Sequence, residues 1–210
     1  MYKSIIAIVT SFGLALGVAA SASASDALLA GDPERGKTLT TTCQACHGPD
    51  GKSPTDAFPS LAGQHEKYLL KQMQDQLAGD RVIAVMTGLL DNYSEQDLVD
   101  IAAYYASQKA QQGAADPETA ELGEQIYRAG IPRKQIAACS ACHSPTGSGN
   151  NFAKFPMLAG QWPAYTVSQL KMFRTGERHN DGESRMMRAI AMDMSDEEIE
   201  AVANYIYGLR

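Results

Sequence analysis

Two short segments of the chain place a pair of thiols and an imidazole where they could hold one ligand together. Cys43-Gln-Ala-Cys46-His47 returns later in the chain as Cys139-Ser-Ala-Cys142-His143. Cysteines three residues apart lie on neighbouring turns of one helical face, so both thiols can point toward the same group. The imidazole that directly follows the second thiol can then reach a metal held by that group. All four cysteines of the chain fall in these two segments.

The Cys-x-x-Cys-His pattern predicts covalent attachment of a c-type haem. Each thiol adds to a vinyl group of the porphyrin, and the histidine binds the iron. A four-cysteine zinc site would use both pairs but has no use for the histidines. A thiol redox motif would need a βαβ setting, and disulfides within such short loops would be strained. The sequence therefore predicts two covalently bound haem c groups, attached through Cys43, Cys46, Cys139 and Cys142 and ligated by His47 and His143.

A six-coordinate electron-transfer haem needs a second axial ligand, and methionine raises the reduction potential relative to histidine. Met86 and Met187 each stand eight residues before a serine that could cap a helix, Ser94 and Ser195. This match selects them as the predicted ligands. Met186 stays open as a competitor for the second iron because it is adjacent to Met187. The other methionines are expected in the core or on the surface, and Met73 aligns with a leucine. His65 and His179 have no histidine counterparts in the other half and are expected on the surface.

The rest of the chain repeats in the same order. Phe58-Pro-Ser-Leu-Ala-Gly-Gln64 matches Phe155-Pro-Met-Leu-Ala-Gly-Gln161, and a tyrosine and a glutamine recur beyond each segment. The repeat predicts an N-terminal domain over 25–110 and a C-terminal domain over 111–210, joined through the polar stretch 111–117. Residues 1–24 have a basic start, an apolar stretch and small-residue cleavage sites, which are typical of a signal peptide. An uncleaved membrane anchor remains the alternative for this segment.

Local signals predict only helices in the mature chain. Asp32-Pro33 and Asp116-Pro117 place an N-cap before a proline at the first helical position. Middle helices are expected over 64–78 and 163–175. Ser94 with Asp97, and Ser195 with Glu198, form candidate capping boxes. An apolar stripe follows each box at helical spacing: Leu98, Ile101, Ala102 and Tyr105, then Ile199, Val202, Ala203 and Ile206.

Several repeated residues allow more than one interpretation. The carbonyl of Pro59 or Pro156 could accept the Nδ1–H of the haem-ligating histidine and fix its tautomer. The alternative is a plain loop-to-helix turn. The matched tyrosines and glutamines could line a haem edge or hold its propionates, or could only pack: Tyr68, Tyr165, Gln72 and Gln169. Four arginines of the second half could also neutralise propionates, although several must be solvated: Arg174, Arg178, Arg185 and Arg188.

The composition limits the class of partner. The formal net charge of −6 argues against nucleic acid and against anionic membranes as principal partners. Export would place the protein in the periplasm. Two filled axial positions leave no open site on either iron, so the sequence favours an electron carrier over an enzyme.

The chain resembles the cytochrome c4 family of dihaem class I cytochromes c. The resemblance covers the mature chain and rests on both Cys-x-x-Cys-His-x-Pro motifs, both Phe-Pro-x-Leu-Ala-Gly-Gln segments, Met86-Thr-Gly-Leu-Leu-Asp and the sequence Ala-Ala-Tyr-Tyr-Ala-Ser-Gln. It implies an all-α fold of two tandem class I cytochrome c domains related by a pseudo-twofold, with propionates near the interface. It also implies His/Met ligation, which maps onto His47/Met86 and His143/Met187. The first-half segment between Gly79 and Met86 is shorter than is usual in the family.

The family implies a carrier that passes electrons from a donor such as a quinol-oxidising complex to an acceptor such as a terminal oxidase. A monomer is expected, and peripheral association with a membrane is compatible with this role. The first alternative is a dihaem subunit of a periplasmic oxidoreductase such as a flavocytochrome c sulfide dehydrogenase. The second is a dihaem enzyme such as a peroxidase or a thiosulfate dehydrogenase, against which the matched methionines argue.

Overall fold

The computed structural model describes residues 30–210, so the expected signal peptide over 1–24 lies outside the described residues. Within this range the regular elements are helices, and β-type pairing is limited to two isolated bridges, Ile131–Ile136 and Asn150–Phe155. The expected all-α class is confirmed. None of the described helices has the length and apolar character needed to cross a membrane.

The two halves repeat one order of elements. The first half contains α1 (Pro33–Leu39), α2 (Gln44–His47), α3 (Glu66–Ala78), the 3₁₀ helix η1 (Ala84–Met86) and α4 (Glu95–Ser107). The second half contains α5 (Pro117–Ala129), η2 (Pro132–Lys134), α6 (Ser140–His143), α7 (Pro163–Thr175), α8 (Met186–Ala191) and α9 (Asp196–Gly208). The second half therefore adds η2 before its motif helix and has the α-helix α8 where the first half has only η1.

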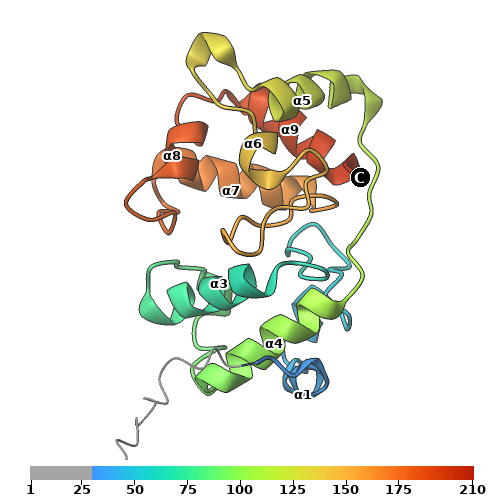
Figure 1. Cartoon of the computed structure of the whole chain (residues 1–210), viewed down its shortest axis with the longest axis vertical. Coiled ribbons are helices and arrows are strands. Elements are labelled where there is room, and N and C mark those ends of the chain that lie inside the picture. Colours follow the sequence, from blue (N-terminus) through green and yellow to red (C-terminus); the bar gives the residue numbers. More distant parts are fainter. Residues whose placement is uncertain (1–29) are drawn as a thin grey trace, which may run out of the picture.

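The halves are stacked along the long axis of the molecule (Figure 1). The middle helices α3 and α7 face each other across the boundary, while α4 with α1 and α9 with α5 lie at opposite ends. The connecting segment after α4 runs along one side of the molecule. Whatever α3 and α7 present to each other therefore lies between the two halves.

A glycine allows close approach where the first and last helices of each half cross. A Cβ on Gly36 of α1 would lie 2.0 Å from the carbonyl oxygen of Asp100 on α4. A Cβ on Gly123 of α5 would lie 2.2 Å from the carbonyl oxygen of Ala201 on α9. Any larger residue would push the helices apart, so the same crossing is specified twice by the sequence.

The expected helix signals are present in the structure. Asp32 and Asp116 accept backbone N–H groups at the starts of α1 and α5, and both capping boxes form. The apolar stripes of α4 and α9 are buried throughout. One boundary differs from the expectation, because α3 begins at Glu66 rather than at Gln64. The side-chain oxygen of Gln64 accepts the N–H of His65 instead, at 3.0 Å.

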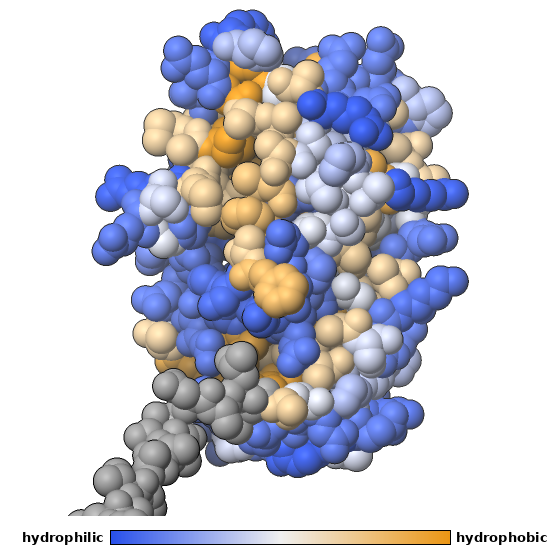
Figure 2. All heavy atoms as spheres, in the orientation of Figure 1, coloured by the Kyte–Doolittle hydropathy of each residue, from blue (hydrophilic) through white to orange (hydrophobic). Residues whose placement is uncertain are grey.

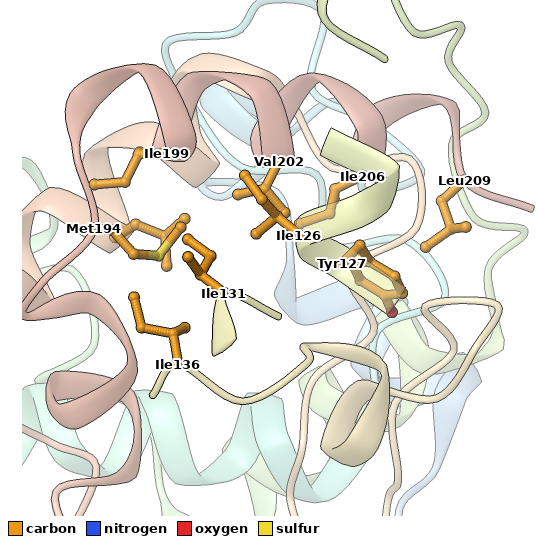
Figure 3. Packing of buried hydrophobic residues seen from close by; sticks show 10 residues of the cluster. Ile126, Tyr127, Ile131, Ile136, Met194, Ile199, Val202, Ile206 and Leu209 are labelled. Atoms are coloured by element: carbon orange, nitrogen blue, oxygen red, sulfur yellow. The ribbon is translucent and has the colours of Figure 1, made fainter. Parts of the chain in front are cut away.

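Each half has its own apolar core, and the two cores differ in size. Figure 3 shows the core of the second half, where side chains from α5, α9 and the segment around η2 meet. Its buried members are Ile126, Tyr127, Ile131, Ile136, Leu170, Met194, Ile199, Val202, Ile206 and Leu209. The buried cluster of the first half is smaller: Leu69, Ile101, Ala102, Tyr104 and Tyr105.

Candidate cofactor sites

Each Cys-x-x-Cys-His segment forms a single helical turn, α2 or α6. The N–H of His47 bonds to the carbonyl of Cys43 at 2.9 Å, and the N–H of His143 bonds to that of Cys139 at 2.9 Å. The turn places the two thiols and the imidazole of each segment at i, i+3 and i+4, on one face of the helical turn. None of the four cysteines, all of which lie within the described residues, pairs in a disulfide, so the thiols of each segment are available to a shared ligand.

The two histidines are buried and oriented in the same way. His47 Nδ1 lies 2.9 Å from the carbonyl oxygen of Pro59, and His143 Nδ1 lies 2.9 Å from that of Pro156. Burial lowers the pKa of both imidazoles, and the proline carbonyls oppose this only in part. The neutral ring therefore donates from Nδ1 and keeps the lone pair of Nε2 free for a metal. Of the two interpretations of the prolines, the histidine-orienting one has the geometry it needs.

The first thiol of each pair, Cys43 or Cys139, does not have the lowered pKa of a redox or zinc-binding thiolate. Burial raises the pKa of Cys43, and it raises that of Cys139 to about 11. Low thiol pKa values are the usual mark of reactive thiolates, and these two cysteines show the opposite shift. Within residues 30–210, no three or more His, Cys, Asp or Glu side chains gather as a metal site would need. The two pairs therefore do not combine into a zinc site.

The methionines predicted as axial ligands differ in their surroundings. Met86 ends η1 and is half-buried, next to the exposed side chains of Val85 and Leu89. Met187 is half-buried in the first turn of α8 and packs against the second core. Met186 points outward, with 46% of its surface exposed. The packing favours Met187 over Met186, and the assignment of both axial methionines stays a prediction.

Several residues that the sequence left open have defined partners. Met73 packs against the first core, as expected. His65, expected on the surface, is instead half-buried, and its Nε2 bonds to the carbonyl oxygen of Ser148 in the other half, at 2.7 Å. His179 is exposed, as expected. Two of the candidate arginines form ion pairs with carboxylates, Arg174 with Asp196 and Arg188 with Asp181.

Arg178 and its counterpart Arg81 form a buried polar cluster between the halves. Both guanidinium groups donate to the Oε1 atoms of Gln72 and Gln169. Arg81 also donates to the hydroxyl of Tyr165 at 3.0 Å, across the boundary. Arg178 makes the reciprocal bond to the hydroxyl of Tyr68 at 3.2 Å. On the outer surface in Figure 2, hydrophilic side chains surround a hydrophobic ring at about the level where the halves meet.

Arg81 is not among the residues predicted from the sequence, although the sequence contains a signal for it. Gly79-Asp-Arg81 and Gly176-Glu-Arg178 follow the middle helices at matching positions. Each glycine ends its helix in a left-handed conformation, with φ of 82° and 79°. The arginine two residues later is thereby turned back under the helix toward the boundary. Tyr68, Tyr165, Gln72 and Gln169 are thus hydrogen-bonding partners of this pair.

The residues of each half fit a covalently bound haem. A turn of helix offers two free thiols and a neutral imidazole with an available Nε2, and a half-buried thioether lies in the segment after the middle helix. Such a donor set is the one that His/Met ligation of a c-type haem requires. The two sets are equivalent by the internal repeat, so the chain can hold two such groups.

Comparisons with known proteins agree with this geometry. The family model described as cytochrome c matches residues 33–109 and again 120–210. Cytochrome c4 of Azotobacter vinelandii is 50% identical over 189 residues, which cover 86% of this chain and 90% of the relative. The crystal structure of cytochrome c4 from Pseudomonas stutzeri superposes with a TM-score of 0.85 at 49% identity and covers 86% of this chain and 100% of the other. A thiosulfate dehydrogenase electron acceptor of Stutzerimonas stutzeri is 38% identical, over 78% of this chain and 76% of its own.

Proposed function

Because the chain belongs to the cytochrome c4 family of dihaem electron-transfer proteins, we propose that it is a periplasmic carrier that passes single electrons toward a terminal oxidase. The observation that carries this proposal is the exact repetition of the histidine environment. Each half buries a neutral imidazole whose Nδ1 is held by a proline carbonyl at 2.9 Å. The proposed domains are 25–110 and 111–210, a division supported by the two matched ranges.

In this proposal the protein holds and shields the two redox groups. Cys43, Cys46, Cys139 and Cys142 anchor the haems through thioethers. His47 and Met86 ligate the first iron, and His143 and Met187 ligate the second. The haem iron supplies one-electron chemistry when bound. The protein fixes the ligands, excludes water and presents the haem edges to partners.

The relatives also support a second, narrower role. One similar protein is described as a thiosulfate dehydrogenase electron acceptor, and another with that description, from Thiomonas intermedia, is 36% identical to this chain. This chain would then accept electrons from an oxidoreductase rather than perform the oxidation. The alternative proposal is that the chain is the dihaem electron-transfer subunit of a periplasmic oxidoreductase such as a flavocytochrome c sulfide dehydrogenase. A quinol-oxidising complex is the proposed donor in the main role.

A spectroscopic redox titration of the protein, matured with haem in a periplasm, tests the proposal. We expect two one-electron waves at positive potential and a Met–iron charge-transfer band in the oxidised state. A high-spin haem that binds carbon monoxide readily would contradict His/Met ligation at that site. Rates of reduction by a quinol-oxidising complex and by a thiosulfate dehydrogenase, measured side by side, would separate the two roles.

A further inference from the structure

Gln64 and Gln161, the last residues of the repeated Phe-Pro-x-Leu-Ala-Gly-Gln segments, each bind the backbone of the other half. The Oε1 of Gln161 accepts the N–H of Ser60 at 3.0 Å, and its Nε2 donates to the Ser60 carbonyl at 2.9 Å. Gln64 makes the reciprocal pair with Met157, at 2.8 and 2.9 Å. Each side-chain amide thus pairs with one residue across the boundary, as a strand would.

The peptide that each glutamine binds is the one that orients the axial histidine. The Ser60 N–H and the Pro59 carbonyl belong to the same peptide group, and that carbonyl accepts from His47 Nδ1. A continuous chain of hydrogen bonds therefore runs from His47, through this peptide, to Gln161 of the other half. The Pro156–Met157 peptide links His143 to Gln64 in the same way.

Hydrogen bonds fix the orientation of both glutamine side chains. Gln64 is 5% exposed. Each Oε1 also accepts the N–H of the following residue at 3.0 Å, His65 in one half and Trp162 in the other. Two donors on one oxygen and a carbonyl on the nitrogen fix the orientation of the amide.

We propose that each glutamine is a positioning residue for the axial histidine of the opposite half, so that Gln161 tunes the first iron and Gln64 the second. This inference rests on the proposed function, because it needs a haem in each half. Donation of the peptide N–H to Oε1 polarises the peptide and makes its carbonyl a stronger acceptor. A stronger acceptor on Nδ1 makes the imidazole a more basic ligand. A more basic ligand favours Fe(III), so each glutamine lowers the reduction potential of the iron in the other half.

The test is a crossed pair of substitutions in the haem-loaded protein, with both potentials measured. Gln161→Leu should raise the midpoint potential of the first-half iron and leave the second unchanged. Gln64→Leu should raise only that of the second-half iron. Met86→His, combined with each variant, identifies the first-half wave, because a histidine ligand lowers its potential. Gln161→Asn, one methylene shorter, replaces Gln161→Leu if that variant yields no holoprotein.

Trp162→Phe is the matched control. It removes another hydrogen bond across the boundary, from Trp162 Nε1 to the Ser53 carbonyl at 3.2 Å, and this bond does not involve a histidine-orienting peptide. Both potentials should stay in place in this variant. A shift confined to the substituted half, equal shifts in both halves, or no shift would overturn the inference. A wild-type protein without two haem waves would instead overturn the proposed function on which the inference rests.

Discussion

The two halves orient their histidines identically but support their methionines differently. His47 and His143 bond to equivalent proline carbonyls, Pro59 and Pro156, at the same distance of 2.9 Å. Met86 stands at the end of a 3₁₀ turn beside exposed Val82 and Val85, which are 71% and 68% exposed. Met187 belongs to α8, which packs on the second core. The histidine environments of the two halves are therefore alike, whereas the segments that carry the methionines differ in structure.

The second half, whose methionine lies in an α-helix, also has the larger apolar core. The second half has a longer first helix, α5, and the additional segment around η2 brings Ile131 and Ile136 into its core. The first half has the shorter α1 and a smaller buried cluster. A small domain depends more on its prosthetic group for apolar burial. We infer that the first half relies more on its haem for stability than the second.

The largest effect should come from replacing the methionine ligands. Met86→His and Met187→His should each lower one midpoint potential by roughly 0.2–0.3 V, within the ~0.8 V range that axial ligands cover. Only Met187→His should also lower the melting temperature clearly, because only Met187 packs against a core. Redox titration and calorimetry measure the two effects. Equal losses of melting temperature in the two variants would remove the proposed difference between the halves.

Truncation of the two cores should give the next largest effect. Ile199→Ala should destabilise the second half by about 4 kcal/mol, near the upper part of the usual range for a buried isoleucine. Ile101→Ala should cost about 2–3 kcal/mol. Fewer buried side chains surround Ile101, so its truncation removes fewer contacts. Both side chains are almost fully buried, at 0% and 2% exposure. Denaturant unfolding of the holoprotein, followed by far-UV circular dichroism, measures the difference; a larger cost for Ile101→Ala would reverse the order of the cores.

The sequence predicted what local patterns determine. Capping boxes, prolines at helix starts and apolar stripes act within a few residues, and all of them correspond to observed helices. The Cys-x-x-Cys-His turns and the proline carbonyls also lie near each other in the chain, so the histidine geometry could be anticipated.

The contacts between the halves could not be predicted in the same way. Gln64 and Met157 are far apart in sequence, and nothing local indicates that a glutamine side chain pairs with a backbone in the other half. The repeat showed that Gln64 and Gln161 are equivalent but not that they cross the boundary. The role of Arg81 could have been anticipated, because its alignment with Arg178 is visible in the sequence. The α-helical form of α8 against η1 depends on packing on the larger core, which a sequence pattern does not report.

Acid should affect the first half through a carboxylate that the second half lacks. Asp100 is 1% exposed, and Ala201 occupies the equivalent position. Burial alone would raise the pKa of Asp100, but bonds from the Asp32 N–H, Arg35 and Gln96 outweigh it and lower the pKa. A carboxylate with a lowered pKa stabilises the folded state above its unfolded pKa of about 3.9, and this contribution is lost as the pH falls through the folded value.

Asp100→Asn should therefore destabilise the first half at pH 7, by roughly 1–3 kcal/mol for the disturbed hydrogen bonds. It should also reduce the further loss of first-half stability below about pH 4. The second half should keep its own acid dependence, to which Glu198 contributes through its lowered pKa. Unfolding of the variant and the wild type from pH 7 to 3, with each half followed by hydrogen exchange, measures this. An unchanged acid profile of the first half would show that other carboxylates control it.

The smallest expected difference concerns the caps of the last helices. Ser94→Ala and Ser195→Ala each remove a side-chain acceptor from the capping box, which costs about 1 kcal/mol on average. In the second half, Glu198 stays bonded to the Ser195 N–H and is also held by Lys134, at 2.7 Å, and by Arg133, at 2.9 Å.

In the first half, Asp97 keeps its bond to the Ser94 N–H but has only Arg35, which is 44% exposed and also serves Asp100. Exposed ion pairs contribute little, and Arg133 is itself 73% exposed, so the difference rests on Lys134, which is only 24% exposed. Its bond to Glu198 should protect the start of α9 better than Arg35 protects that of α4. Ser94→Ala should thus lower amide protection at residues 95–98 more than Ser195→Ala does at 196–199. Hydrogen exchange at neutral pH measures both variants in one experiment, and Lys134→Ala added to Ser195→Ala should remove the advantage of the second half.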